Sequence, residues 1–295
     1  MVRYHLFFLV VLPIIYNLVV VLRADFAKLY TSNNSSDYEG NELHSQFKHF
    51  VTSFNKSYVN DPREYTKRKG IFKESLIRQF QLNQKEKLLG GRAVYGVNKF
   101  SDMTTQEFKE FLRRSHIRPS QGTLFGTPKN PEPDLCKVPQ KDHMPTHWNW
   151  HEQGKVTSIK NQGKVYYTLA PESECPYEDK QTDCIDTLKH SKSGVTIKRP
   201  CSKYRADEMS YIKPVVAFVG TVSVNVDATQ WHDYLSGIIQ HHCSAIDINH
   251  AVQIVGFDTK GVVPYWIVRN SWGTEFGDQG YLYIEMGKNL CGKFV

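Results

Sequence analysis

The chain has 295 residues, of which 13% are aromatic, so its composition excludes an intrinsically disordered protein and allows one or two domains with a sizeable core. Its net charge of +7 would suit an acidic partner such as nucleic acid. Residues 41–118, however, carry 16 Lys and Arg against 8 Asp and Glu, and the rest of the chain is close to neutral. We interpret this positive segment as a solvated helix face and predict no nucleic-acid partner.

The first expected element is a signal over residues 1–23. Arg3 and His5 precede an apolar run from Leu6 to Leu22, which is long for a signal-peptide core and slightly short for a membrane span. We favour a secretory signal and keep an uncleaved anchor, which would attach the chain to a membrane, as the alternative. Either one directs the chain into the secretory pathway, with a lysosomal or extracellular destination.

Entry into the secretory pathway would allow two covalent modifications, disulfide formation and glycosylation. The six cysteines become candidates for disulfide bonds. The sequons that begin at Asn33, Asn34 and Asn55 become possible acceptors for glycosylation, which would make the protein a glycoprotein.

Residues 41–115 predict a helical segment. An apolar stripe with helical spacing extends from Leu43 to Tyr58. Asp61 and Pro62 are typical of an N-cap and a first helical residue, and the long polar helix that follows can continue to the glycine pair at 90–91. The run TTQE at 104–107 is a capping box ahead of a shorter helix.

A linker and a strand-rich region follow. Residues 115–145 hold six prolines and little periodicity, and we assign a linker that proteases can cut to residues 116–142. From 143 to 295 the pattern predicts short strands, in the runs PVVAFVGTVSVNV, HAVQIVGFD, YWIVRN and YLYIEM. A helical segment ahead of a cleavable linker suggests a zymogen.

Two motifs in the helical segment resemble a known inhibitory propeptide. The interspersed signature E-x3-R-x3-F-x2-N-x3-I-x3-N is matched at four positions (Glu64, Arg68, Phe72, Asn83) and departs at two (Ser75, Gln79). The second signature, G-x-N-x-F-x-D, is complete from Gly96 to Asp102. In this order and ahead of a linker, the two motifs resemble the propeptide of papain-like cysteine peptidases of the cathepsin type.

Two motifs in the strand-rich region resemble the catalytic site of the same family. INHAVQIVGFD contains its histidine motif, which implies a catalytic role for His250, and YWIVRNSWGTEFGDQGYLYIE contains its asparagine motif, which implies one for Asn270. IKNQG would place the oxyanion-hole glutamine at Gln162. The resemblance covers residues 43 to 293 and implies an α+β fold with the two lobes of papain, one helical and one resembling a β-barrel.

The nucleophile of that family is missing. A C-G-[SA]-C-[WY] run should follow Gly163, but this chain continues KVYYTLAP. Read without a gap, Thr168 would take the nucleophile's place only 82 residues before His250, whereas the family separates Cys from His by about 130–150 residues. We therefore expect an internal deletion near residues 164–168 that removed the nucleophile with its helix, so that the helical lobe is largely deleted and the β lobe retained.

The remaining cysteines fit such a deletion. The resemblance implies a disulfide between Cys243 and Cys291, and a partner for Cys184 inside the lost block. The pairing of the other cysteines therefore stays open: Cys136, Cys175, Cys184 and Cys201.

The run QHHC at 240–243 is the main candidate for a metal site. Adjacent residues of an extended chain point to opposite faces, so these side chains rarely converge on one ion. The run HWNWH at 147–151 resembles the family's mature N-terminus and not a ligand cluster. We predict no metal and no cofactor.

Three hypotheses follow. In the first, the chain is a cathepsin-like zymogen whose family cleaves proteins or peptides, but which is inactive here because the nucleophilic Cys is absent. In the second, it is a non-enzymatic inhibitor whose propeptide binds related cysteine peptidases. In the third, it is a splice or gene-model fragment of an active peptidase.

Overall fold

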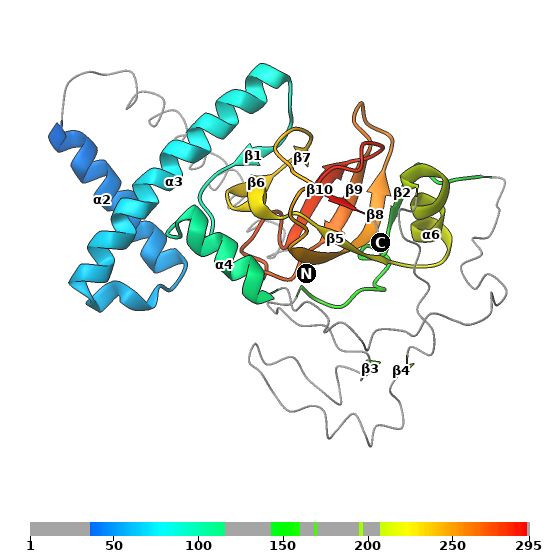
Figure 1. The fold of residues 1–295 in the computed structure, drawn as a ribbon, viewed down its shortest axis with the longest axis horizontal. Helices are drawn as coiled ribbons and strands as arrows, with labels where there is room; N and C mark the ends of the chain where they lie inside the picture. The colour runs from blue at the N-terminus through cyan, green and yellow to red at the C-terminus, as the bar shows by residue number, and fades with distance from the viewer. Residues whose placement is uncertain (1–35, 116–142, 160–167, 170–194, 197–206, 294–295) are drawn as a thin grey trace, which may run out of the picture. The chain divides into compact units, whose positions relative to one another are not determined.

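The computed structural model describes residues 36–115, 143–159, 168–169, 195–196 and 207–293. The protein divides into two compact units, residues 1–65 and 66–295, which Figure 1 colours from blue to red along the chain. The expected signal at 1–23 and the expected linker at 116–142 lie outside the described residues.

The first unit contains α2 (Ser36–Ser53), η1 (Ser57–Asn60) and the start of α3 (Pro62–Leu89). The predicted apolar stripe is buried at Phe47, Phe50 and Val51, and the ring of Phe47 meets that of Tyr65 edge-on with centroids 4.9 Å apart. Asp61 caps α3 as its sequence predicts, because its carboxylate accepts hydrogen bonds from the N–H groups of residues 63 and 64.

The second unit begins within α3 and continues through β1 (Val94–Tyr95) to α4 (Thr105–Ser115). α3 ends where Gly90 takes a positive φ of 66°, which a glycine adopts without strain. The capping box at the start of α4 is confirmed: the Glu107 N–H donates to Thr104 Oγ1 (3.1 Å), and the Thr104 N–H donates to Glu107 Oε2 (2.8 Å).

A mixed sheet forms the centre of the second unit (Figure 1). Its strand order is β11-β5-β8-β9-β10-β7, with β2 paired to β8 outside this path. The strands are β2 (His147–Asn149), β5 (Val222–Val226), β7 (Ile238–Ile239), β8 (His250–Asp258), β9 (Tyr265–Arg269), β10 (Tyr281–Glu285) and β11 (Gly292–Lys293). β8, β9 and β10 are antiparallel neighbours, so the start of β8 and the end of β9 lie at the same edge of the sheet.

Two short strand pairs complete the described sheets. β6 (Tyr234–Ser236) pairs with β1, which joins the loop ahead of β7 to the helical segment. β3 (Thr168–Leu169) pairs with β4 (Val195–Thr196). A single-turn η3 (Thr229–Trp231) links β5 to β6.

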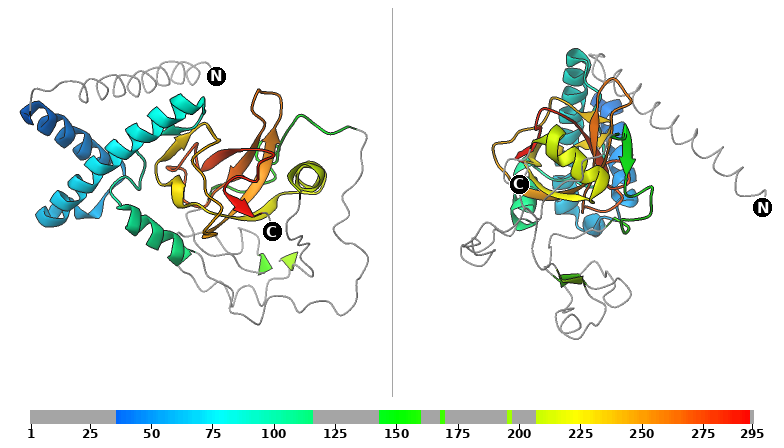
Figure 2. Two further views of the ribbon diagram at one scale, coloured as in Figure 1. Left: turned by 45° about the horizontal axis from the view of Figure 1, so that its top comes forward. Right: turned by 90° about the vertical axis from the view of Figure 1, so that its right-hand side faces the viewer.

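One expected strand is partly wrong. The run PVVAFVGTVSVNV was predicted to be extended, but its first half belongs to α6 (Lys213–Phe218), and only its second half forms β5. α6 continues the π-helix η2 (Glu208–Ile212), which Asp207 caps by accepting hydrogen bonds from the N–H groups of Met209 and Ser210. Because a short apolar run fits a buried helix as well as a strand, this upstream cap decides the structure. α6 lies beside β2 and β8 (Figures 1 and 2).

The core of the second unit combines residues from before and after the linker. Phe100, Phe108 and Leu112 of the helical segment are at most 3% exposed and belong to one cluster with the sheet. The ring of Phe100 meets the indole of Trp272 edge-on at 5.5 Å, and Trp272 in turn contacts Phe276 at 4.6 Å. The helical segment therefore contributes core to the strand-rich part instead of lying on its surface.

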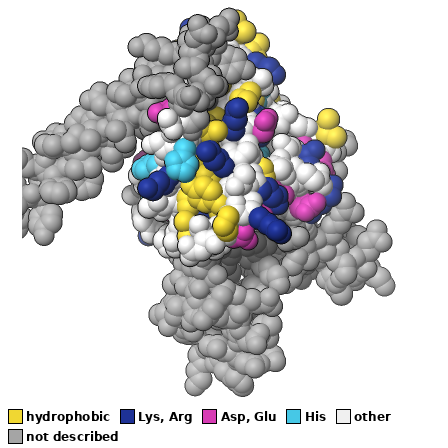
Figure 3. Space-filling view, turned by 90° about the vertical axis from the view of Figure 1, so that its left-hand side faces the viewer, with side chains coloured by type: hydrophobic (Ala, Val, Ile, Leu, Met, Phe, Trp, Pro, Cys, Tyr) yellow, Lys and Arg dark blue, Asp and Glu magenta, His cyan; other side chains and the backbone are white. Residues whose placement is uncertain are grey.

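The surface drawn in Figure 3 is mixed in character: Lys and Arg side chains alternate with acidic and hydrophobic ones instead of forming one continuous basic patch. Asn55, one of the sequon asparagines, is exposed, and its glycosylation stays a prediction. Among the helices of the described residues, none has the length and apolar character needed to cross a membrane.

Candidate active site

His250 and Asn270 meet at one edge of the sheet. His250 is the first residue of β8, and Asn270 directly follows the last residue of β9. Because these strands are antiparallel neighbours, the two side chains come together, with His250 Nε2 2.8 Å from Asn270 Oδ1. Both residues are buried, at 5% and 2% exposure, so this hydrogen bond is shielded from water.

The hydrogen bond fixes the tautomer of the histidine. An amide oxygen can only accept, so Nε2 of His250 carries the proton and donates it to Asn270 Oδ1. Nδ1 is then the ring nitrogen that would exchange a proton with a reacting group, which is the arrangement of a Cys-His-Asn site.

The backbone around Asn270 holds its amide in this orientation. The Ser271 N–H donates to Asn270 Oδ1 (2.8 Å), and the Asn270 N–H donates to the carbonyl of Gly280 (3.0 Å). Asn270 Nδ2 is buried and has no hydrogen-bond partner within the part of the chain that the structure describes.

Two tryptophans surround the His250 ring. Trp272 stacks on it, with centroids 4.6 Å apart and planes at 28°, and Trp231 approaches it edge-on at 6.2 Å. Both indoles are at most 2% exposed, so they exclude water from the His250–Asn270 pair. Neither tryptophan was among the site residues predicted from the sequence. Trp272 lies in the quoted asparagine motif, which was a signal, whereas Trp231 had no comparable signal.

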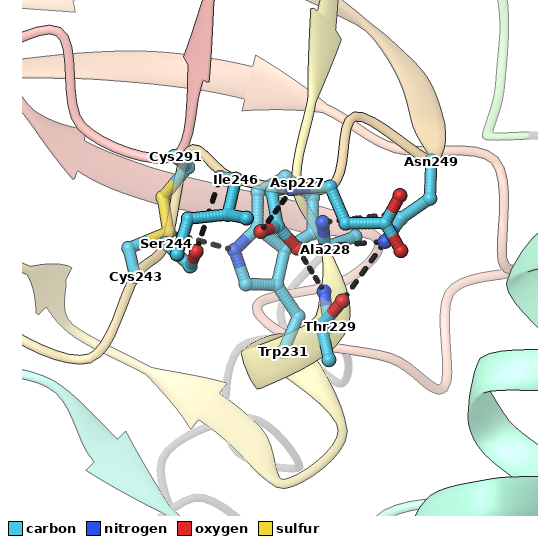
Figure 4. The surroundings of a disulfide bond; sticks show 10 residues. Asp227, Ala228, Thr229, Trp231, Cys243, Ser244, Ile246, Asn249 and Cys291 are labelled. Atoms are coloured by element: carbon cyan, nitrogen blue, oxygen red, sulfur yellow. Dashed lines mark hydrogen bonds between the residues drawn. A yellow bond between two sulfur atoms is a disulfide. The ribbon is translucent and has the colours of Figure 1, made fainter.

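The loop that carries Trp231 is tied to the residue before His250 (Figure 4). Asn249 Nδ2 donates to Thr229 Oγ1 (2.9 Å), and the Ala228 N–H donates to Asn249 Oδ1 (3.0 Å). Burial would raise the pKa of the nearby Asp227 carboxyl, but hydrogen bonds, chiefly from Thr229, outweigh it and hold the pKa below its usual range. This network fixes the start of β8 against the loop.

The sulfur atoms of Cys243 and Cys291 lie at disulfide distance beside this network, with Cα atoms 4.9 Å apart (Figure 4). The indole N–H of Trp231 points at Cys243 Sγ, 3.4 Å away. The pairing would therefore link the loop that shields His250 to the C-terminal strand β11.

The other predicted site residues lie elsewhere. Gln162 and residues 164–167 lie outside the described residues, as do Cys136, Cys175, Cys184 and Cys201. Thr168 is the first residue of β3. The structure therefore brings together two of the three candidate catalytic residues.

The candidate metal run is engaged in other contacts. Cys243 has the sulfur partner described above, and His242 Nε2 lies 3.4 Å from the Glu86 carboxylate. In the described ranges no group of three or more His, Cys, Asp or Glu residues is arranged to hold a metal ion.

Known protein families match both parts of the chain. The papain family cysteine protease domain matches residues 165–293, and the cathepsin propeptide inhibitor domain (I29) matches residues 47–108. Cathepsin O of Homo sapiens is 30% identical over 287 aligned residues, which cover 78% of this chain and 87% of that protein. A viral cathepsin of Heliothis zea nuclear polyhedrosis virus is 28% identical and covers 83% of this chain and 82% of its own length.

Solved structures show the same fold. Digestive procathepsin L 3 from the larval midgut of Tenebrio molitor superposes with a TM-score of 0.64 at 20% identity, over 84% of this chain and 95% of that one. Procathepsin L2 from the same source gives a TM-score of 0.61 at 22% identity, over 85% and 97%. The expected α+β, papain-like fold is thereby confirmed.

Proposed function

Because the chain belongs to the papain family of cysteine proteases and carries the family's propeptide inhibitor domain, we propose that it is a member without peptidase activity of its own. The observation that carries this proposal is the contrast between an intact His250–Asn270 pair and a stretch after Gly163 without a cysteine. Membership of this family implies that the molecules it binds would be proteins or peptides and that its location would be lysosomal or extracellular.

The His250–Asn270 pair serves a nucleophile but does not replace one. In a Cys-His-Asn site the imidazolium lowers the thiol pKa and later protonates the leaving amine, while the amide holds the ring in place. Here the pair retains its hydrogen bond, but the sequence offers no thiol directly after Gly163 to form the acyl intermediate. One donor of the oxyanion hole, the nucleophile's own N–H, would be missing as well.

The alignment length supports a missing block. The 78% of this 295-residue chain that aligns with human cathepsin O is about 230 residues, whereas the alignment spans 287. The difference of about 57 positions is similar to the shortfall expected from the Cys-to-His spacing of the family, about 50–70 residues. Removal of a block is therefore favoured over replacement of one residue.

The test is hydrolysis by the purified full-length chain, before and after cleavage of the linker. We expect no turnover of peptide substrates above the rate of the His250→Ala variant, because removing the nucleophile of a triad enzyme lowers kcat by about 10⁶. A vinyl-sulfone probe should label no specific cysteine of the reduced chain. Stoichiometric labelling of one cysteine that His250→Ala abolishes would contradict the proposal.

Inhibition of related peptidases is the second candidate, and the burial of the helical segment favours it. Within residues 93–112, five apolar side chains are at most 5% exposed and share one core cluster with the strand-rich part, which supports the capacity of this segment to bind a papain-type lobe. The chain at micromolar concentration should slow several papain-type peptidases, less so as salt rises, because its segment is positively charged. Unchanged rates for all of them would exclude this role.

A further inference from the structure

A buried carboxylate of the strand-rich part is held by one helix of the propeptide segment. Asp233 lies just before β6, and its side chain is 2% exposed. Arg78 of α3 holds it with two N–H groups, Nε to Oδ2 at 2.5 Å and Nη2 to Oδ1 at 3.0 Å. Gln79 Nε2 adds a third donor to Oδ1, also at 3.0 Å. All three of these donors come from residues that precede the linker.

The two residues that depart from the propeptide signature, Ser75 and Gln79, both form hydrogen bonds within this contact. Ser75 stands where the signature has Asn, and its Oγ accepts a hydrogen bond from Arg78 Nη2 (2.8 Å). Gln79 stands where the signature has Ile, and it donates to Asp233 and to Ser101 Oγ (3.2 Å). Both residues are nearly inaccessible, at 0% and 4% exposure. A buried Ile at position 79 would leave the carboxylate one donor short, so these departures fit the acid opposite them.

Several other polar contacts near this carboxylate are made to the backbone of the lobe and therefore do not depend on the lobe's side chains. β1 pairs with β6 through main-chain groups, and the Gly96 N–H donates to the carbonyl of Asp233 (2.9 Å). Asn98 Nδ2 donates to the carbonyls of His232 (2.9 Å) and Tyr234 (3.2 Å). Such contacts would form with any lobe that presents the same strand.

We propose that the Arg78–Asp233 pair makes the propeptide segment selective for its own kind of lobe. After the linker is cut, the segment 66–115 stays bound to lobes that carry a carboxylate at this position, and it exchanges onto second copies of this chain more readily than onto papain-type lobes that lack the carboxylate. This inference refines the inhibitory role proposed above by naming the partner, and it does not depend on whether the chain hydrolyses peptides.

The physical basis is an asymmetry between the two charges. The Arg78 side chain is 28% exposed and can turn its guanidinium toward water when the carboxylate is absent. Asp233 has no such option, because a buried carboxylate left without its partner keeps its full desolvation cost. Loss of the arginine from the segment should therefore weaken binding more than loss of the acid from the lobe.

The experiment measures exchange of the segment in full chains whose linker carries an engineered protease site. Cut chain is mixed with cut, isotopically labelled chain, and native mass spectrometry follows the appearance of mixed pairs. We expect Arg78→Gln to raise the exchange rate by about 100-fold and Asp233→Asn by about 10-fold. The double variant should exchange more slowly than Arg78→Gln alone, because it buries no unpaired charge.

A matched control removes a charge from the same helix without touching the pair. Arg63 is exposed on α3, so Arg63→Gln should exchange at the wild-type rate. Equal rates for Arg63→Gln and Arg78→Gln, or a double variant as fast as Arg78→Gln, would overturn the proposal. If Arg78→Gln does not fold, Arg78→Lys is the substitute, because it keeps the charge but loses the bidentate contact. This variant should still exchange about 10-fold faster than wild type. Exchange of Arg78→Lys at the wild-type rate would also overturn the proposal.

Discussion

At the scale of single residues, the histidines of this protein differ in how their surroundings shift their pKa. His147 on β2 lies between two carboxylates, with Nε2 2.9 Å from Glu152 and Nδ1 2.9 Å from Asp258. These contacts, the one to Glu152 first, raise its pKa despite partial burial. A raised folded-state pKa means that the folded protein binds the proton more tightly than the unfolded chain does.

His147 should therefore stabilise the protein in acid. The contribution is fully present below the ordinary histidine pKa of about 6.5 and is lost as the pH rises through the raised pKa of the folded state. We expect the Tm difference between wild type and His147→Gln to be largest near pH 5 and to shrink toward pH 8. A difference that stays constant with pH would show that the ion pairs do not contribute.

His232 should behave in the opposite way. Its ring stacks on Phe108 at 4.4 Å, and its Nε2 donates to the carbonyl of Phe100 (3.0 Å). Burial lowers its pKa, and the positive charge of Arg78 acts in the same direction, whereas Asp233 and Asp102 oppose it. The stability that the neutral ring provides is present above about pH 6.5 and is lost as the pH falls through the lowered pKa.

The lowered pKa of His232 predicts that acid loosens the contact between α4 and the loop from η3 to β6 that carries His232. Amide hydrogen exchange of α4 should speed up below pH 6 more than the intrinsic pH dependence of exchange explains. His232→Gln, which does not titrate, should remove that excess. Identical pH profiles for the two proteins would rule out His232 as the cause.

At the scale of elements, the capping box of α4 gives a prediction about local stability. Thr104 and Glu107 satisfy each other's N–H groups, and Arg68 of α3 donates to the same Glu107 carboxylate (3.0 Å). Thr104→Ala should lower the free energy of unfolding by about 1 kcal/mol, as for other helix N-caps. Urea denaturation measures this loss, and Thr105→Ala, one residue further on, should cost clearly less.

Elements defined by local chemistry could be predicted from the sequence, and those defined by distant contacts could not. The caps at Asp61 and Thr104 act within three residues, so their sequence alone reveals them. α6 was expected to be a strand because its apolar run carries no local signal for either structure. In the site, the motifs indicated His250 and Asn270, whereas the Arg78–Asp233 contact joins residues 155 positions apart, and no sequence period connects them.

At the scale of the whole molecule, the missing nucleophile leads to a prediction about the transcripts that encode this chain. If a block near residues 164–168 was lost in splicing or in assembly of the gene model, some transcripts should encode a C-G-S-C-W-like run after Gly163. Sequencing of transcripts across codons 160–172 checks this. Deep coverage that contains only the short form would favour a gene whose product is permanently inactive.

The shared aromatic core also determines when this protein can finish folding. Phe108 precedes its partner Trp272 by 164 residues, so the apolar face of α4 emerges long before the chain that covers it. At about 5–20 residues per second, the ribosome needs roughly 10–30 s to make that intervening stretch. During this interval the first-made helices carry an uncovered aromatic surface, which is the kind of surface that chaperones bind. The order of synthesis thus means that the aromatic surface of the N-terminal helices stays exposed to water until the C-terminal part of the chain has been made and covers it.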